Sequence, residues 1–157
     1  MRIDLEAPIS VGGSIGGLAL GAPVVKYRTL LFETWSKQGP ASATVVGPME
    51  VRYHLPGVNV GVDSFTGIVF KLTAVSGYRG SFNGVTVGMS LKEAGQLLPE
   101  LFFDETYSLF RLQGCEGLCI ETSLDDPLES EAWRSTVAFI TITDVEHYQM
   151  MRDRQWQ

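Results

Sequence analysis

The stretch Ser81-Phe82-Asn83-Gly84-Val85-Thr86-Val87-Gly88 repeats the pattern of an earlier one, Ser14-Ile15-Gly16-Gly17-Leu18-Ala19-Leu20-Gly21. Each copy alternates apolar residues, ends in glycine and leads into a segment with helical spacing. Segments with the alternation of β-strands then follow each predicted helix. A duplicated unit of this kind is typical of a scaffold that displays a surface, and it disfavours a chain organised around a catalytic pocket.

In the first half, residues 24–35 are predicted to be helical, because apolar residues recur at helical spacing after Pro23. Strands are predicted over 49–55, 58–62 and 68–75. In the second half, Ser90 and Glu93 predict a capping box at the start of a helix that ends near Pro99. The strands predicted there cover 107–112, 118–122 and 137–145. Between the last two lies an acidic loop, 124–134, with or without one helical turn.

The order of a helix and three strands therefore occurs twice. It predicts an α+β fold in which two tandem helix-β-β-β repeats form one antiparallel sheet, with the helices packed on one face. The repeats span about 9–75 and 76–147, and the tail 148–157 is a frayed end or a short helix. Because the link 76–80 is short, the chain 1–157 is expected to be a single domain. The uncovered face of the sheet is solvated or forms a binding surface.

Residues 82–90, followed by Glu93 and a short apolar helix, resemble the repeat signature of the β-lactamase inhibitor protein. They are also similar to the small lipoproteins of outer-membrane protein assembly. Both families build on a helix-plus-sheet unit, and the inhibitor protein has it in tandem. The inhibitor's disulfides have no full counterpart in this chain. The resemblance implies the architecture and not the target.

Composition gives a second indication of function. The chain has 157 residues and a formal net charge of −6, which disfavours a nucleic-acid binder. More than half of the carboxylates lie between Glu93 and Glu131, either as a solvated face or as a patch that attracts a cationic protein. Size, acidity and organisation together resemble the immunity proteins that bacteria pair with secreted toxins, such as those delivered by type VI secretion.

This second resemblance implies a cognate toxin as partner, a basic one such as a nuclease, whose active site carboxylates would block. Aromatic and arginine side chains are the usual anchors of protein interfaces. The residues expected to contact the partner are Tyr53, Tyr78, Arg79, Tyr107, Glu116, Glu121, Asp125, Asp126, Glu129, Glu131 and Trp133. We expect no catalytic residue, no metal, no cofactor and no membrane partner.

Other chemistry is weakly indicated. His54 and His147 lie in different halves and outside any metal-binding spacing, although an enzyme using His54 or the cysteines is an alternative. Cys115 and Cys119 are free thiols, a disulfide or half of a zinc site. The glycine-rich segment 12–17 lacks the lysine and hydroxyl residue of a phosphate loop. The acidic loop lacks the spacing of a calcium loop.

The N-terminus lacks the apolar core of a signal peptide, and no apolar run approaches about 18 residues. We therefore expect a cytoplasmic protein with reduced thiols. The alternative is a scaffold for cell-envelope assembly, which a lipidated cysteine upstream would favour. The β-branched strand 137–145, if it lies at a sheet edge, is expected to support a homodimer.

Overall fold

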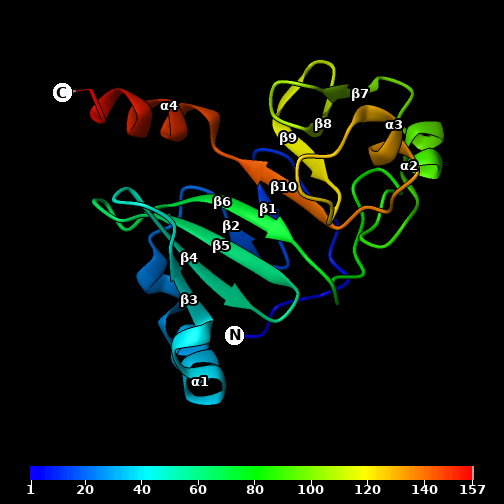
Figure 1. Cartoon of the computed structure of the whole chain (residues 1–157). Coiled ribbons are helices and arrows are strands. Elements are labelled where there is room, and N and C mark those ends of the chain that lie inside the picture. The colour runs from blue at the N-terminus through cyan, green and yellow to red at the C-terminus, as the bar shows by residue number, and fades with distance from the viewer. Residues whose placement is uncertain (157) are drawn as a thin grey trace.

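The computed structural model describes residues 1–156, which form an α+β fold around an eight-stranded antiparallel sheet (Figure 1). The sheet order is β3-β4-β5-β6-β10-β9-β8-β7. Its strands are β3 (Ala43–Val45), β4 (Glu50–Leu55), β5 (Val58–Asp63), β6 (Val69–Ala74), β7 (Leu101–Asp104), β8 (Leu109–Leu112), β9 (Cys115–Glu121) and β10 (Phe139–Thr143). The predicted fold class is thus confirmed. Gln157, the end of the predicted tail, lies outside the described residues.

The helices are α1 (Arg28–Gln38), α2 (Leu91–Leu97), α3 (Glu129–Trp133) and α4 (Val145–Arg154), and α1 is preceded by a 3₁₀ turn over Val24–Tyr27. Ser90 caps α2 as predicted, since its side chain accepts the Glu93 amide at 3.1 Å. The ten-residue α4 contains most of the predicted tail but begins earlier, at Val145, where the Asp144 side chain accepts the His147 amide at 3.0 Å. In the part of the chain that the structure describes, no helix is both long and apolar enough to cross a membrane.

The sheet is arranged symmetrically about its centre. The last strand of the first half, β6, pairs antiparallel with the last strand of the second half, β10. Each half contributes a helix followed by four strands, one more than the predicted three. The additional strands, β3 and β7, are short and lie at the two edges. Neither shows the alternation of apolar and polar residues that marks a half-buried strand.

The two copies of the glycine motif adopt the same turn. The central residues have positive φ angles in both: 62° and 86° at Gly16 and Gly17, and 47° and 88° at Asn83 and Gly84. Two successive positive φ values are the geometry of a tight two-residue hairpin, which explains why glycine and asparagine occupy these positions. In the first copy the turn joins the two-stranded hairpin of β1 (Ser14–Ile15) and β2 (Leu18–Ala19).

The glycine that ends each copy has the same contact in both halves. The amide of Gly21 donates to the carbonyl of Val69 at 2.8 Å, and the amide of Gly88 donates to the carbonyl of Val137 at 2.7 Å. Each contact ties the start of one half to the segment that forms or precedes its last strand. The repeated sequence thus has one structural role in each half.

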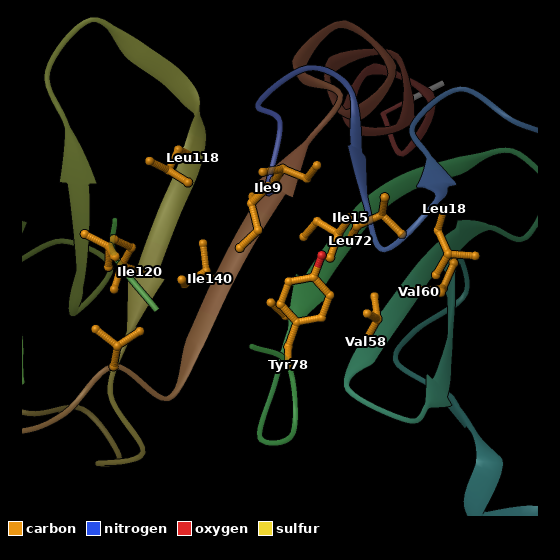
Figure 2. Packing of buried hydrophobic residues seen from close by; sticks show 14 of the residues in the cluster. Ile9, Ile15, Leu18, Val58, Val60, Leu72, Tyr78, Leu118, Ile120 and Ile140 are labelled. Atoms are coloured by element: carbon orange, nitrogen blue, oxygen red, sulfur yellow. The ribbon is translucent and has the colours of Figure 1, made fainter. Parts of the chain in front are cut away.

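The main core lies on one face of the sheet (Figure 2). Alternate residues of β5, β6, β9 and β10 point into it, as expected for strands buried on one side. The N-terminal segment and the β1–β2 hairpin cover the first half, whereas Leu91 and Ala94 of α2 and Ala132 of α3 are buried over the second. A separate small cluster joins Met151 of α4 to Met49 and Phe70.

The prediction that strand 137–145 could lie at a sheet edge and support a homodimer is wrong, because this strand lies inside the sheet. Residues 137–145 contain β10, which is shorter than predicted and pairs on one side with β6 and on the other with β9. Its backbone groups are therefore used within the chain. The free edges belong to β3 and β7.

Candidate functional site

The face of the sheet opposite the main core is polar and carries a groove of about 740 Å³. Lys71 and Thr73 of β6 line it, whereas the intervening Leu72 belongs to the core. The same alternation places Thr141 of β10 and Cys119 of β9 in the groove. Strands of both halves therefore supply its floor, and α4 lies at its margin.

The floor contains a row of uncharged hydrogen-bonding groups. Asn59, Thr73, Thr141 and Cys119 are cross-strand neighbours in successive strands of the sheet. The hydroxyls of Thr73 and Thr141 are hydrogen-bonded at 2.9 Å across the junction between the halves. The centre of the groove is thus a polar surface without a formal charge.

Charged side chains flank this row on both sides. Glu50 accepts Arg52 Nη2 at 3.1 Å and lies 3.6 Å from Lys71 Nζ. In the other half, Arg111 Nε donates to Asp104 Oδ2 at 2.8 Å, and this bond lowers the pKa of Asp104. Arg152 of α4, Glu116 and Glu121 also line the groove. The groove therefore has mixed charge, in contrast to the acidic surface expected from the sequence.

Two exposed tyrosines stand beside these charges. Tyr107, in the turn between β7 and β8, lies next to Arg111, whose guanidinium carbon is 5.0 Å from the centre of the tyrosine ring. Tyr148 comes from α4, where its ring is stacked near Phe70 with the ring centres 6.2 Å apart. The groove thus offers aromatic surface as well as charge.

Three of the predicted contact residues, Tyr107, Glu116 and Glu121, line this groove. The prediction is wrong for two of the aromatic anchors, which lie on the side of the sheet that carries the main core. Tyr78 is buried, where its hydroxyl donates to the carbonyl of Ala7 at 2.7 Å and accepts the amide of Gly16 at 3.0 Å. Tyr53 is half-buried against the main core.

The predicted acidic surface is divided between the two sides of the sheet. Trp133 of α3 packs edge-on against Phe110 on the core side, with the ring centres 4.7 Å apart. Its indole nitrogen donates to Glu129 at 3.4 Å. Glu131 accepts the amide of Leu128 at 3.0 Å and so caps the same helix. These three predicted contact residues stabilise α3 and do not line the groove.

The remaining predicted contact residues are exposed and lie outside the groove lining. Asp125 and Asp126 follow β9, and Asp126 accepts the hydroxyl of Ser108. Arg79 forms an exposed ion pair with Glu6 at 3.1 Å. Exposed pairs of this kind contribute little to stability, so these side chains are available to a partner without a large structural cost.

Neither histidine lies in an open site. His54 contacts the Thr44 hydroxyl through Nε2 at 2.8 Å and the Asn59 side-chain oxygen through Nδ1 at 3.0 Å. His147 of α4 is buried and contacts Asp63 Oδ2 through Nε2 at 2.8 Å. Among residues 1–156, no three histidine, cysteine or acidic side chains are placed to hold a metal ion.

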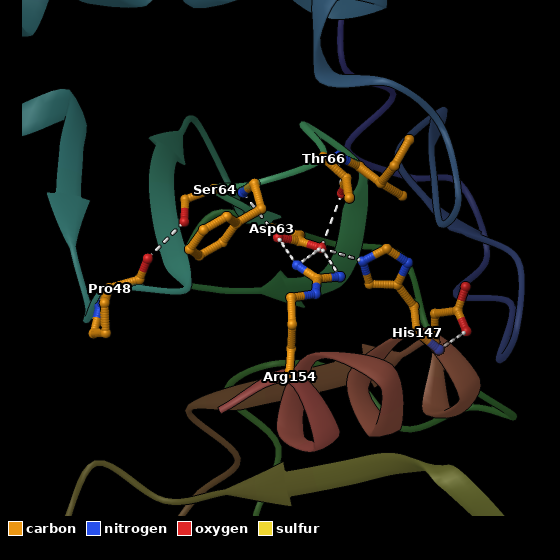
Figure 3. Close-up of polar contacts among 9 residues, drawn as sticks. Pro48, Asp63, Ser64, Thr66, His147 and Arg154 are labelled. Carbon is orange, nitrogen blue, oxygen red and sulfur yellow. Dashed lines mark hydrogen bonds and ion pairs between the residues drawn. The ribbon is translucent and has the colours of Figure 1, made fainter. Parts of the chain in front are cut away.

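Asp63 is the centre of a buried cluster that sequence reasoning missed (Figure 3). Besides His147, it accepts Arg154 Nη2 at 3.2 Å, the Thr66 hydroxyl at 2.9 Å and the Phe65 amide at 2.9 Å. Burial alone would raise the pKa of Asp63, but these hydrogen bonds together hold it well below its ordinary value. Through His147 and Arg154, the cluster holds α4 against the turn after β5.

The two cysteines are free. Cys115 packs against the main core, whereas Cys119 lines the groove on the other side of the sheet. Of the alternatives left open by the sequence, Cys115 and Cys119 are therefore thiols and do not form a disulfide.

Comparison of the chain with family models, with curated proteins and with solved structures gives no match.

The Cys119 thiol is expected to react slowly despite its position in the groove. Burial and, to a smaller extent, the nearby Glu121 carboxylate raise its pKa to about 11, against the opposing effect of Thr141, Arg111 and Lys71. Because the thiolate is the reactive form, we expect alkylation of Cys119 by iodoacetamide at pH 8 to be on the order of a hundredfold slower than that of an ordinary thiol. Peptide mass spectrometry of the alkylated protein measures this rate. Equal rates in native and urea-unfolded protein would contradict it.

Proposed function

We propose that this chain is an immunity-type protein that binds a cognate bacterial toxin and blocks its active site with the open face of the sheet. The observation that carries the proposal is the groove that both halves build, with its uncharged floor, flanking charges and exposed tyrosines. Each half alone supplies only part of this surface. A tandem repeat is therefore a direct way to make a broad docking face.

The side chains of the groove suit a protein partner better than a small ligand. Tyrosine and arginine are enriched among the residues that dominate binding energy, and Tyr107 with Arg111 forms such a pair. Charges of both signs select a partner loop with a complementary pattern and disfavour others. The net charge of −6 additionally attracts a basic toxin over longer distances.

The test is co-expression with the toxin encoded by the neighbouring open reading frame. The wild-type chain should rescue growth and co-purify with the toxin. Arg111→Glu should weaken the complex about 30-fold or more, the effect of losing an interface hot spot. The matched control is Arg79→Glu, the same charge reversal at an exposed position outside the groove, which should leave affinity within about threefold.

Two outcomes contradict the proposal. One is growth inhibition that persists with the wild-type chain present, together with no co-purification. The other is equal affinity of the wild type and the Arg111→Glu variant, which would place the interface elsewhere.

A further inference from the structure

The two edges of the sheet differ in charge. An edge strand presents unpaired N–H and C=O groups, and proteins usually protect such an edge with charged side chains. At β7 this protection is present, since Glu100, Asp104 and Glu105 lie at its two ends. At β3 it is absent, because the whole stretch from Gln38 to Met49 contains no charged residue.

The register of β3 shows which of its groups point away from the sheet. Val46 donates its amide to the carbonyl of Glu50 at 3.0 Å, and Thr44 lies opposite Arg52 two residues earlier. Hydrogen-bonded and non-bonded pairs alternate in an antiparallel ladder, so Thr44 and Arg52 form a bonded pair. The N–H and C=O groups of Val45 and the C=O group of Ala43 therefore point outward, free to bond with another strand, whereas the N–H of Ala43 donates to the carbonyl of Pro40 within the chain.

The surroundings of this edge are apolar. Val45 and Val46 are 75% and 47% exposed, and on α1, which leads towards β3 in Figure 1, Phe32 and Trp35 are 71% and 50% exposed. Scattered exposed apolar residues are ordinary, but Val45 and Val46, adjacent and exposed on an uncharged edge, indicate an interaction surface.

We propose that β3 pairs antiparallel with β3 of a second copy of this chain, about a twofold axis at Thr44. In this register Ala43 of each copy lies opposite Val45 of the other. In each such pair the N–H of Val45 donates to the carbonyl of Ala43 in the other copy, while the N–H of Ala43 stays bonded to Pro40. The two symmetric pairs therefore form two backbone hydrogen bonds between the copies. The two sheets then continue into one another, and the open faces of both copies lie on the same side.

Charge favours a second copy at β3 and opposes it at β7. Copies with a net charge of −6 repel one another, so self-association requires a surface without carboxylates. The same pairing about Phe102 of β7 would place Glu100 of one copy opposite Asp104 of the other, and like charges directly opposite are destabilising. At β3 the flanking pair is Ser42 opposite Val46, and neither carries a charge.

Sedimentation equilibrium of the full chain tests the pairing. The apparent molecular mass of the wild type should rise with concentration from 17.2 kDa, the mass of one chain, to twice that value. Val45→Pro removes an outward N–H without breaking a bond to β4, and Val45→Lys places a cation on the edge, so both should stay monomeric. Val45→Thr, which keeps the N–H, should still dimerise. Circular dichroism confirms that each variant is folded.

Hydrogen exchange gives a second readout, residue by residue. The amide of Val45 should exchange more slowly as the concentration of the wild type rises, whereas the amides of Ala43 and Thr44, both bonded within the chain, should not change. A wild type that stays monomeric up to about 1 mM overturns the proposal. So does a dimer that persists in folded Val45→Pro. Neither result depends on whether the chain binds a toxin.

Discussion

Replacing Asp63 with alanine is expected to lower the free energy of unfolding by about 3–5 kcal/mol, the usual effect of removing one partner of a buried ion pair. The change leaves Arg154 and buried His147 without their shared carboxylate. It also removes the hydrogen bond that the Asp63 carboxylate accepts from the Thr66 hydroxyl in the turn after β5. Because His147 and Arg154 both belong to α4, the helix should be the first element to detach.

Urea unfolding measures the total effect, and hydrogen exchange of the α4 amides locates it. The matched control is Asp153→Ala. It removes an exposed carboxylate from the same helix, where this carboxylate accepts a hydrogen bond from the Gln149 side chain at 2.8 Å. This control should change stability by no more than about 0.5 kcal/mol. If both variants unfold at the same urea concentration, the buried cluster does not hold α4.

The same cluster should make the free energy of unfolding depend on pH. Since the pKa of Asp63 is lower in the folded chain than in the unfolded one, the ionised carboxylate stabilises the fold at neutral pH. This contribution is complete above the unfolded pKa, about 3.9, and is lost as the pH falls further towards the folded pKa. The stability difference between the wild type and Asp63→Ala should therefore narrow below about pH 4. An unchanged difference between pH 7 and pH 3 would show that another feature accounts for it.

Phe110→Ala should have an effect of similar size, about 3–5 kcal/mol, because it opens a cavity in the core of the second half. Phe110 is fully buried between Phe103 and Trp133, with ring centres 5.2 and 4.7 Å away. Its loss removes the surface on which α3 packs. Urea unfolding followed by circular dichroism measures the change.

Phe102→Ala is the matched control for this prediction. Phe102 is a phenylalanine of the neighbouring strand β7 that points away from the core and is partly exposed. Its truncation should cost no more than about 1 kcal/mol. Similar costs at the two positions would mean that Trp133 and α3 do not depend on Phe110.

Local patterns predicted much of the fold. The N-cap at Ser90, the strands with clear alternation and the paired glycine motifs all depend on neighbours in the sequence, and the structure contains each of them. The edge strands were missed because their pairing is decided by the adjacent strand and not by their own composition. Leu101–Asp104 is an example, since it reads as an apolar run before acidic residues.

The functional surface was harder to predict because it depends on contacts between distant segments. Tyr78 looked like an exposed anchor between the halves, but the N-terminal segment folds over it and accepts its hydroxyl at Ala7. Asp63 and His147 are 84 residues apart, and no local signal connects them. The acidic stretch looked continuous, but β9 and α3 place its members on opposite sides of the sheet. Alternation in β9 alone could have assigned Cys119 and Glu121 to one face.

The junction of β6 and β10 has a consequence for how the chain folds. Every other neighbouring pair in the sheet joins strands that are consecutive in sequence, whereas the junction joins residues such as Thr73 and Thr141, 68 positions apart. Short-range hairpins form quickly, and closing a long loop is slow. We therefore expect two early four-stranded meanders and a late, rate-limiting docking step. Until that step, each meander exposes a central strand that is open to pairing with the wrong chain.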